Sequence, residues 1–155
     1  MKKIKLTQGK FAIVDEQDYP LLVSRKWFAV HDKNRRWYAA TKIGKKTVKM
    51  HRFILDCAEM VLTDHINRDG LDNCRRNLRE CNFSQNMANS IKREKTSSKF
   101  KGVGLDKDTG KWRARIRVNG DEIHLGRFND ESKAAAAYNA AALRVFGEFA
   151  NLNVI

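Results

Sequence analysis

Residues 63–86 read TDHINRDGLDNCRRNLRECNFSQN, and this stretch decides the local fold. It opens with a short β-prone run that ends at Asp64 and His65, and the residues that follow are rich in turn-forming Asn, Asp and Gly. We therefore expect the chain to reverse direction there and to return as a second strand over residues 78–83, after which Ser84 caps a helix. The expected order is strand, loop, strand, helix.

This arrangement lets a carboxylate, an imidazole and a carboxamide converge, and that combination suits hydrolysis of a phosphodiester bond. An imidazole with a reference pKa of about 6.5 can take a proton from water at neutral pH, so His65 is the candidate general base. Asp64 and the amide oxygen of Asn86 supply two oxygen ligands for a hard divalent cation and leave positions for water and phosphate. Asn77 is expected to brace the loop so that His65 keeps one orientation.

Three short motifs fall at the spacing of one known family: Asp64-His65, Asn77-Leu78-Arg79 and Ser84-Gln85-Asn86. The stretch resembles the HNH endonucleases with the ββα-metal fold, particularly the phage and intron-encoded homing type. The resemblance implies His65 as base, Asp64 and Asn86 as metal ligands, and Asn77 as the loop-bracing residue. Because Asn86 stands at the third letter of the family name, where histidine is common, Mg²⁺ is expected, with Mn²⁺ as the alternative, over a softer ion.

Simpler interpretations of these residues remain open. An Asp-His pair at a strand end can be only a turn, and a Ser-x-Asn sequence can be only a helix cap. Cys57, Cys74 and Cys81 are odd in number and lack Cys-x-x-Cys spacing, which predicts reduced thiols in a cytoplasmic protein, as for a phage or prophage protein in a bacterial host. A structural zinc site on Cys74 and Cys81 is the alternative.

The net charge of +13 is unevenly distributed. Residues 1–50 carry 13 basic and 4 acidic side chains and residues 92–127 carry 11 and 5, whereas residues 51–91 carry 5 and 6. Positive charge thus flanks the motifs, and double-stranded DNA is the expected partner, bound by a monomer or a dimer. We find no signal peptide, basic amphipathic helix or apolar run of membrane-spanning length, so no membrane partner is expected. A small-molecule cofactor is not expected either.

The rest of the chain suggests three further segments. Residues 2–50 hold short β-prone runs separated by turns, and residues 51–55 are typical of a short helix. His51, in this helix, is expected either to support the site or to be a buried, hydrogen-bonded histidine. The polar, aperiodic residues 93–99 predict a linker. The expected domains are an HNH endonuclease domain over residues 1–92, with a β-rich part over 1–50 and the ββα-metal core over 51–92, a basic linker over 93–99 and a DNA-binding domain over 100–155.

Strict alternation over residues 111–118 predicts a strand with one apolar and one cationic face. Asn119-Gly120 predicts a hairpin turn, and residues 122–128 return with Ile123 and Leu125 inward. Like charges on one sheet face repel one another unless an anionic partner neutralises them. This favours a surface that binds DNA in its major groove. The expected DNA contacts on these strands are Lys111, Arg113, Arg115, Arg117 and His124.

A helix is expected from its cap at Asp130 to about Phe146, with alanines that allow close approach to the sheet. Family motifs in this region include Phe100-Lys101-Gly102-Val103, Gly110-Lys111-Trp112, Leu125-Gly126-Arg127-Phe128 and Asn151-Leu152. The region resembles the Apetala-type (ethylene-response-factor) DNA-binding domain. The resemblance implies a three-stranded antiparallel sheet packed on one helix. The family's DNA-contact positions correspond here to Lys101, Lys111, Arg115, Arg117 and His124. His124 stands where a tryptophan is usual, so the sequence preference is not carried over.

The whole chain is therefore expected to be an α+β protein, in which a β-rich N-terminal region leads into a ββα-metal nuclease core and then into a three-stranded antiparallel sheet packed on one helix. The expected function is metal-dependent DNA cleavage targeted by the C-terminal domain. A non-catalytic DNA-binding regulator that keeps the nuclease scaffold is the alternative. An RNA-binding protein is disfavoured, because the major groove of duplex RNA is too narrow for such a ribbon.

Overall fold

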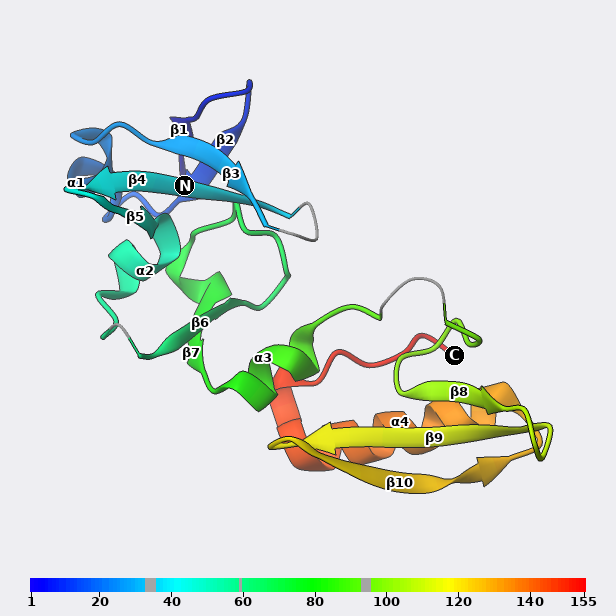
Figure 1. The fold of residues 1–155 in the computed structure, drawn as a ribbon. Helices are drawn as coiled ribbons and strands as arrows, with labels where there is room; N and C mark the ends of the chain where they lie inside the picture. The colour runs from blue at the N-terminus through cyan, green and yellow to red at the C-terminus, as the bar shows by residue number, and fades with distance from the viewer. Residues whose placement is uncertain (33–35, 59, 93–95) are drawn as a thin grey trace. The chain divides into compact units, whose positions relative to one another are not determined.

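The computed structural model describes residues 1–32, 36–58, 60–92 and 96–155. The chain divides into two compact units, Met1–Cys81 and Asn82–Ile155, and each mixes helices with small antiparallel sheets (Figure 1). Of the predicted linker over 93–99, residues 93–95 lie outside the described residues. No helix in the described ranges is long and apolar enough to cross a membrane.

The first unit is rich in short strands. In chain order its elements are β1 (Lys2–Lys5), β2 (Phe11–Val14), α1 (Tyr19–Val23), β3 (Phe28–His31), β4 (Trp37–Ile43), β5 (Lys46–Lys49), α2 (Met50–Leu55), β6 (Leu62–His65), the 3-10 helix η1 (Arg75–Asn77) and β7 (Leu78–Cys81). β1 pairs with β2 and β6 with β7, and the remaining strands form a sheet in the order β3-β4-β5. The predicted β-rich N-terminal region and the short helix after it are confirmed.

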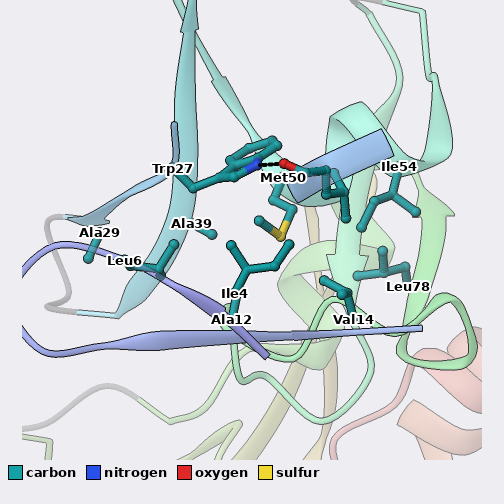
Figure 2. Packing of buried hydrophobic residues seen from close by; sticks show 11 residues of the cluster. Ile4, Leu6, Ala12, Val14, Trp27, Ala29, Ala39, Met50, Ile54 and Leu78 are labelled. Carbon is teal, nitrogen blue, oxygen red and sulfur yellow. Dashed lines mark hydrogen bonds between the residues drawn. The ribbon is translucent and has the colours of Figure 1, made fainter. Parts of the chain in front are cut away.

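One apolar core holds the first unit together, and Figure 2 shows how its side chains meet. Its buried members are Ile4, Leu6, Ala12, Val14, Leu22, Trp27, Ala29, Ala39, Met50, Ile54 and Leu78. The indole Nε1 of Trp27 donates a hydrogen bond of 2.8 Å to the Leu22 carbonyl, so this polar group is satisfied inside the core. Leu78 opens β7, and its burial ties the β6–β7 hairpin to the N-terminal strands.

The loop between β6 and β7 is also held by the backbone of β2. The Ile13 amide donates to the Leu71 carbonyl at 2.8 Å, and the Asn73 amide donates to the Ile13 carbonyl at 2.8 Å. Just after β2, the Asp15 carboxylate accepts a bond of 2.7 Å from the Arg75 amide. The N-terminal strands therefore fix the position of the loop that follows His65.

The second unit is a small sheet packed on a long helix. It contains α3 (Phe83–Asn89), β8 (Val103–Asp106), β9 (Lys111–Val118), β10 (Asp121–Phe128), α4 (Glu131–Phe146) and the 3-10 helix η2 (Gly147–Phe149). The strands are antiparallel in the order β10-β9-β8, and α4 covers one face of the sheet (Figure 1). The predicted three-stranded sheet on one helix is confirmed.

Local sequence signals set the ends of these elements. Asn119 and Gly120 have φ angles of 51° and 101°, as a tight hairpin turn with a type I′ backbone requires. Asp130 caps α4 by accepting a bond of 2.8 Å from the Lys133 amide, and Gly147 ends the helix with a φ of 52°. These boundaries agree with the prediction because they depend on residues that are neighbours in sequence.

Ile123 lies opposite the buried Ile116, on the predicted face of the sheet, but it is 46% exposed because β10 is an edge strand with a neighbour on one side only. One local prediction is wrong. The cap of α3 is Asn82 and not Ser84. Asn82 and Gln85 form a capping box, in which each side chain accepts a bond of 2.8 Å from the backbone amide of the other.

Candidate functional site

Asp64 and His65 lie at the end of β6, where both side chains are buried. β6 pairs with β7 in a register that sets Asp64 opposite Arg79 and His65 opposite Leu78. The hairpin therefore brings the Asp-His motif beside the Asn-Leu-Arg motif, although the two are separated in sequence by the whole loop.

The Asp64 carboxylate forms a buried ion pair with Arg79. Nε and Nη2 of Arg79 donate to the same oxygen, Oδ2, at 3.3 and 3.1 Å, and the two side chains are 9% and 10% exposed. Taking a charge out of water is costly unless it is paired, so each group stabilises the burial of the other. A carboxylate held in this way presents its oxygen atoms at a fixed position, which a hard divalent cation requires of a ligand.

His65 is a buried imidazole in contact with a buried amide. Its Nε2 lies 3.4 Å from Oδ1 of Asn73. Burial lowers the pKa of His65, while the bond to Asn73 and the charge of Asp64 oppose that shift in part. Since Asn73 Oδ1 accepts hydrogen bonds, the contact favours a proton on Nε2 and leaves Nδ1 as the acceptor of this ring. A neutral imidazole at neutral pH can accept a proton, as a general base must.

His51 packs against His65, which the sequence does not reveal. The two rings meet edge to face with centroids 4.7 Å apart, and the Tyr38 ring lies 5.9 Å from His51 and 6.0 Å from His65. Burial lowers the pKa of His51 to about 3, and its Nδ1 has no hydrogen-bond partner among the described residues. Of the two roles expected for His51, support of the site by packing agrees better with this geometry. No periodicity links α2 to β6, so only the tertiary structure brings these rings together.

Asn77 holds the loop after His65 through its buried side-chain amide. Its Oδ1 accepts a bond of 2.9 Å from the Asn67 amide, and its Nδ2 donates to Asn67 Oδ1 and to the Asp72 carbonyl at 3.0 and 2.7 Å. Its backbone carbonyl accepts a bond of 2.9 Å from the Ile66 amide. These bonds join the two ends of the loop, and the part that Asn77 plays in catalysis stays a prediction.

Asn86, the second predicted metal ligand, lies on α3 and is half-buried. Because α3 belongs to the second compact unit and Asp64 to the first, the ligand pair and the ββα-metal arrangement stay predictions. One carboxylate and one amide oxygen fit the chemistry of Mg²⁺. Within the described ranges, no cluster of three or more His, Cys, Asp or Glu side chains is placed to hold a metal ion.

Cys57, Cys74 and Cys81 are free thiols, as predicted. Burial raises the pKa of Cys74 to about 12 and that of Cys81 to about 11. The thiolate is the form that binds zinc. Cys74 and Cys81 are buried, and in the part of the chain that the structure describes they do not belong to any cluster of three or more His, Cys, Asp or Glu side chains that could hold a zinc ion.

The predicted cationic face of β9 is partly neutralised by an acid on β10. Glu122 accepts bonds of 2.9 and 3.0 Å from Nη1 of Arg115 and lies 3.6 Å from Nη2 of Arg117. The bond from Arg115 lowers the pKa of Glu122. An acidic side chain of the same sheet therefore already neutralises part of the repulsion between these arginines, and their contacts with DNA stay predictions. All three side chains are exposed, so the pairs are weak and can exchange for a phosphate.

The other predicted DNA contacts differ in their surroundings. Lys111 and His124 are exposed, and His124 lies opposite Arg115. Arg113 has a buried Nε without a hydrogen-bond partner in the part of the chain that the structure describes. Lys101 instead directs its ammonium group to three carbonyl oxygens at the end of α3, at 2.5–3.1 Å. The candidate contacts thus lie on one sheet, except for Lys101.

Plant transcription factors match part of the chain. A transcription repressor of Arabidopsis thaliana, named for its AP2/ERF and B3 domains, is 37% identical over 70 residues, which are 45% of this chain and 19% of the repressor. An ethylene-responsive transcription factor of the same plant is 43% identical over 58 residues, which are 36% of this chain and 14% of the factor. The shared region is therefore a small part of these relatives. No family model matches the chain, and no solved structure matches it significantly.

A relative that matches nearly the whole chain comes from Acanthamoeba polyphaga mimivirus and is named as an uncharacterized HNH endonuclease. The two proteins are 30% identical over an alignment of 155 positions, which covers 96% of this chain and 77% of the relative. The likeness therefore includes both compact units and is not confined to one motif. The chain belongs to the HNH endonuclease family.

Proposed function

We propose that the chain is a metal-dependent DNA endonuclease, with His65 as general base and with Asp64 and Asn86 as ligands of a divalent metal, Mg²⁺ before Mn²⁺. Family membership supports nuclease activity, and the likeness to AP2/ERF proteins supports DNA as the partner, bound by the sheet of β8–β10. The observation that carries the proposal is the buried His65 with a lowered pKa beside Asp64, in a loop braced by Asn77. The homing type and the phage setting rest on the sequence resemblance alone.

In the proposed reaction, His65 accepts a proton from a water molecule as that water attacks phosphorus. Asn73 and Asn77 keep the ring and its loop in place, so the base meets the water in one orientation. Asp64 and Asn86 would hold the metal, which when bound supplies positive charge for the departing 3′ oxygen. Hydrolysis in this direction leaves 5′-phosphate and 3′-hydroxyl ends.

His65→Ala is expected to lower the rate of cleavage about 10²–10⁴-fold, the usual contribution of a general base, and to keep DNA binding. The measurement is conversion of supercoiled plasmid to open circle with Mg²⁺ or Mn²⁺, with a chelator control. His31→Ala is the matched variant, because His31 is an exposed histidine of the same unit. It should cut at the wild-type rate.

Three other outcomes are informative. Cutting by His65→Ala at the wild-type rate would remove the base assignment. If the wild type binds plasmid DNA in a salt-sensitive way but does not cleave it, the protein would instead be a DNA-binding regulator that keeps a nuclease scaffold. A linear product would indicate paired cuts, by a dimer or by reorientation, since a single metal centre cuts one strand at a time.

A further inference from the structure

The helix that carries Asn86 is too short to be stable by itself. α3 spans only Phe83–Asn89, and isolated helices shorter than about 12–15 residues are marginal in water. Its N-terminus is closed by the capping box of Asn82 and Gln85. The carbonyl groups of its last turn have no partners within the helix, so they need hydrogen-bond donors from residues outside it.

Lys101 supplies these donors. Its Nζ donates to the carbonyl oxygens of Met87, Ala88 and Ser90 at 3.1, 2.5 and 2.7 Å. A lysine ammonium has three protons, so these bonds use its full donor capacity. The C-terminus of a helix carries partial negative charge, and a cation at this position stabilises it. Lys101, which lies just before β8, therefore caps the C-terminal end of α3.

Other groups of the same unit hold α3 from both ends. The amide of Asn151 donates to the Ala88 carbonyl at 3.2 Å, and its side chain donates to the Ser90 carbonyl at 3.2 Å. At the first turn, Ser84 Oγ accepts a bond of 3.0 Å from the Asn119 amide in the β9–β10 turn. Ala88 is buried in one cluster with Ile116, Tyr138, Ala141, Ala142 and Phe146. The helix is thus part of the core of the second unit.

We propose that Lys101 is a positioning residue for DNA cleavage, which fixes Asn86 relative to the sheet of β8–β10 and does not contact DNA itself. This inference rests on the proposed function, because it takes Asn86 as a metal ligand. A DNA-contacting Lys101 would have to give up its bonds to three carbonyl groups, which would leave them only the donors of Ser90 and Asn151 and would remove the positive charge from the end of α3. When the sheet engages DNA, Asn86 is held in a defined place by the same contacts.

The two roles of Lys101 predict opposite results for Lys101→Met. As a positioning residue, Lys101→Met should raise the Mg²⁺ concentration for half-maximal cleavage about 10-fold, as substitutions behind a metal ligand do. Amide hydrogen exchange in α3 should become faster, while DNA affinity and its salt dependence stay unchanged. Lys101→Arg, which keeps a cation with several donors, should restore most of the wild-type behaviour.

Matched variants make the comparison quantitative. Lys111→Met removes an exposed cation of β9 and should weaken DNA binding and reduce the salt slope by about one, which is the signature of a phosphate contact. Lys133→Met removes an exposed cation of α4 and should change neither property. If Lys101→Met proves too unstable to study, Asn151→Ala replaces it, because it removes the side-chain donor to the Ser90 carbonyl and keeps the backbone donor to Ala88. It should change metal dependence and hydrogen exchange in the same direction, by less.

A loss of affinity and salt slope in Lys101→Met, with an unchanged rate at saturating protein, would overturn the proposal and identify Lys101 as a DNA contact. Unchanged exchange in α3 would overturn it as well. If the wild type does not cut DNA at all, the proposed function fails and the catalytic role of Lys101 fails with it. Hydrogen exchange and the salt slope would then still decide whether the Lys101 side chain binds the carbonyl groups of α3 or DNA.

Discussion

At the scale of single residues, two imidazole rings pack edge to face inside the first unit. Burial lowers the pKa of both His51 and His65, and protonation of both rings would place like charges 4.7 Å apart between centroids. Burial makes a charge on either ring unfavourable, and a second charge adds repulsion. Protonation must therefore oppose folding.

The free energy of unfolding is expected to fall as the pH is lowered from about 6.5 toward 3. His51 titrates near 6.5 when unfolded and at about 3 when folded. In this interval the unfolded state binds more protons, so stability rises with pH, by up to about 1.4 kcal/mol per pH unit for one histidine. Urea denaturation at pH 7, 6 and 5 measures the slope. His51→Phe should flatten it and His31→Phe should not; equal slopes in His51→Phe and wild type would contradict the assignment.

At the scale of elements, the parts that could be predicted are those with local signals. Alternation over β9, the Asn119-Gly120 turn and the Asp130 and Gly147 ends of α4 all lie within a few residues of what they determine. The cap of α3 was less accessible, because Asn82 and Ser84 are both good capping residues and only the reciprocal bond with Gln85 distinguishes them. The register of β9 and β10 sets Glu122 opposite Arg117 and diagonal to Arg115, with which it forms its ion pair, and sequence alone does not give this register.

Gly102→Ala is expected to destabilise the second unit by about 2–5 kcal/mol, combining an unfavourable φ with overpacking. Gly102 has a φ of +76°, and a Cβ there would lie 2.0 Å from Cδ2 of Tyr138 and 2.7 Å from the Arg115 carbonyl oxygen. Gly104→Ala is the control, because its Cβ would meet only Ser97 Oγ at 3.7 Å. Thermal unfolding of both variants measures the difference. A similar small effect of both would show that the Tyr138 ring moves aside.

At the scale of the whole molecule, the division into units differs from the predicted domain boundary. The sequence places α3 with the nuclease core over residues 51–92, whereas α3 is grouped with the second unit, which begins at Asn82. The candidate residues Asp64, His65 and Asn77 could be found because their motifs are short and their spacing is fixed. The packing of His51 on His65 and the bonds from Lys101 to α3 could not be predicted, since both contacts join elements that share no pattern in the sequence.

A fragment of residues 82–155 is expected to be more stable than one of residues 93–155. The shorter fragment lacks Ala88 and the carbonyl groups that receive Lys101 and Asn151, a loss of roughly 2 kcal/mol. In a domain of this size that corresponds to a Tm lower by about 8–16 °C. Calorimetry of both fragments provides the test. Equal Tm values would instead favour the predicted boundary near residue 92.

The Asp64–Arg79 ion pair lets the buried Asp64 carboxylate form without a metal ion beside it. A buried carboxylate with no cation beside it would need a metal ion before its hairpin could form, as in proteins that unfold when a chelator removes their ion. In this hairpin, β7 provides the positive charge from the start. Under the proposed function, newly made protein can therefore fold first and acquire a metal ion afterwards, so the supply of metal, and not the completion of the fold, would decide when cutting begins.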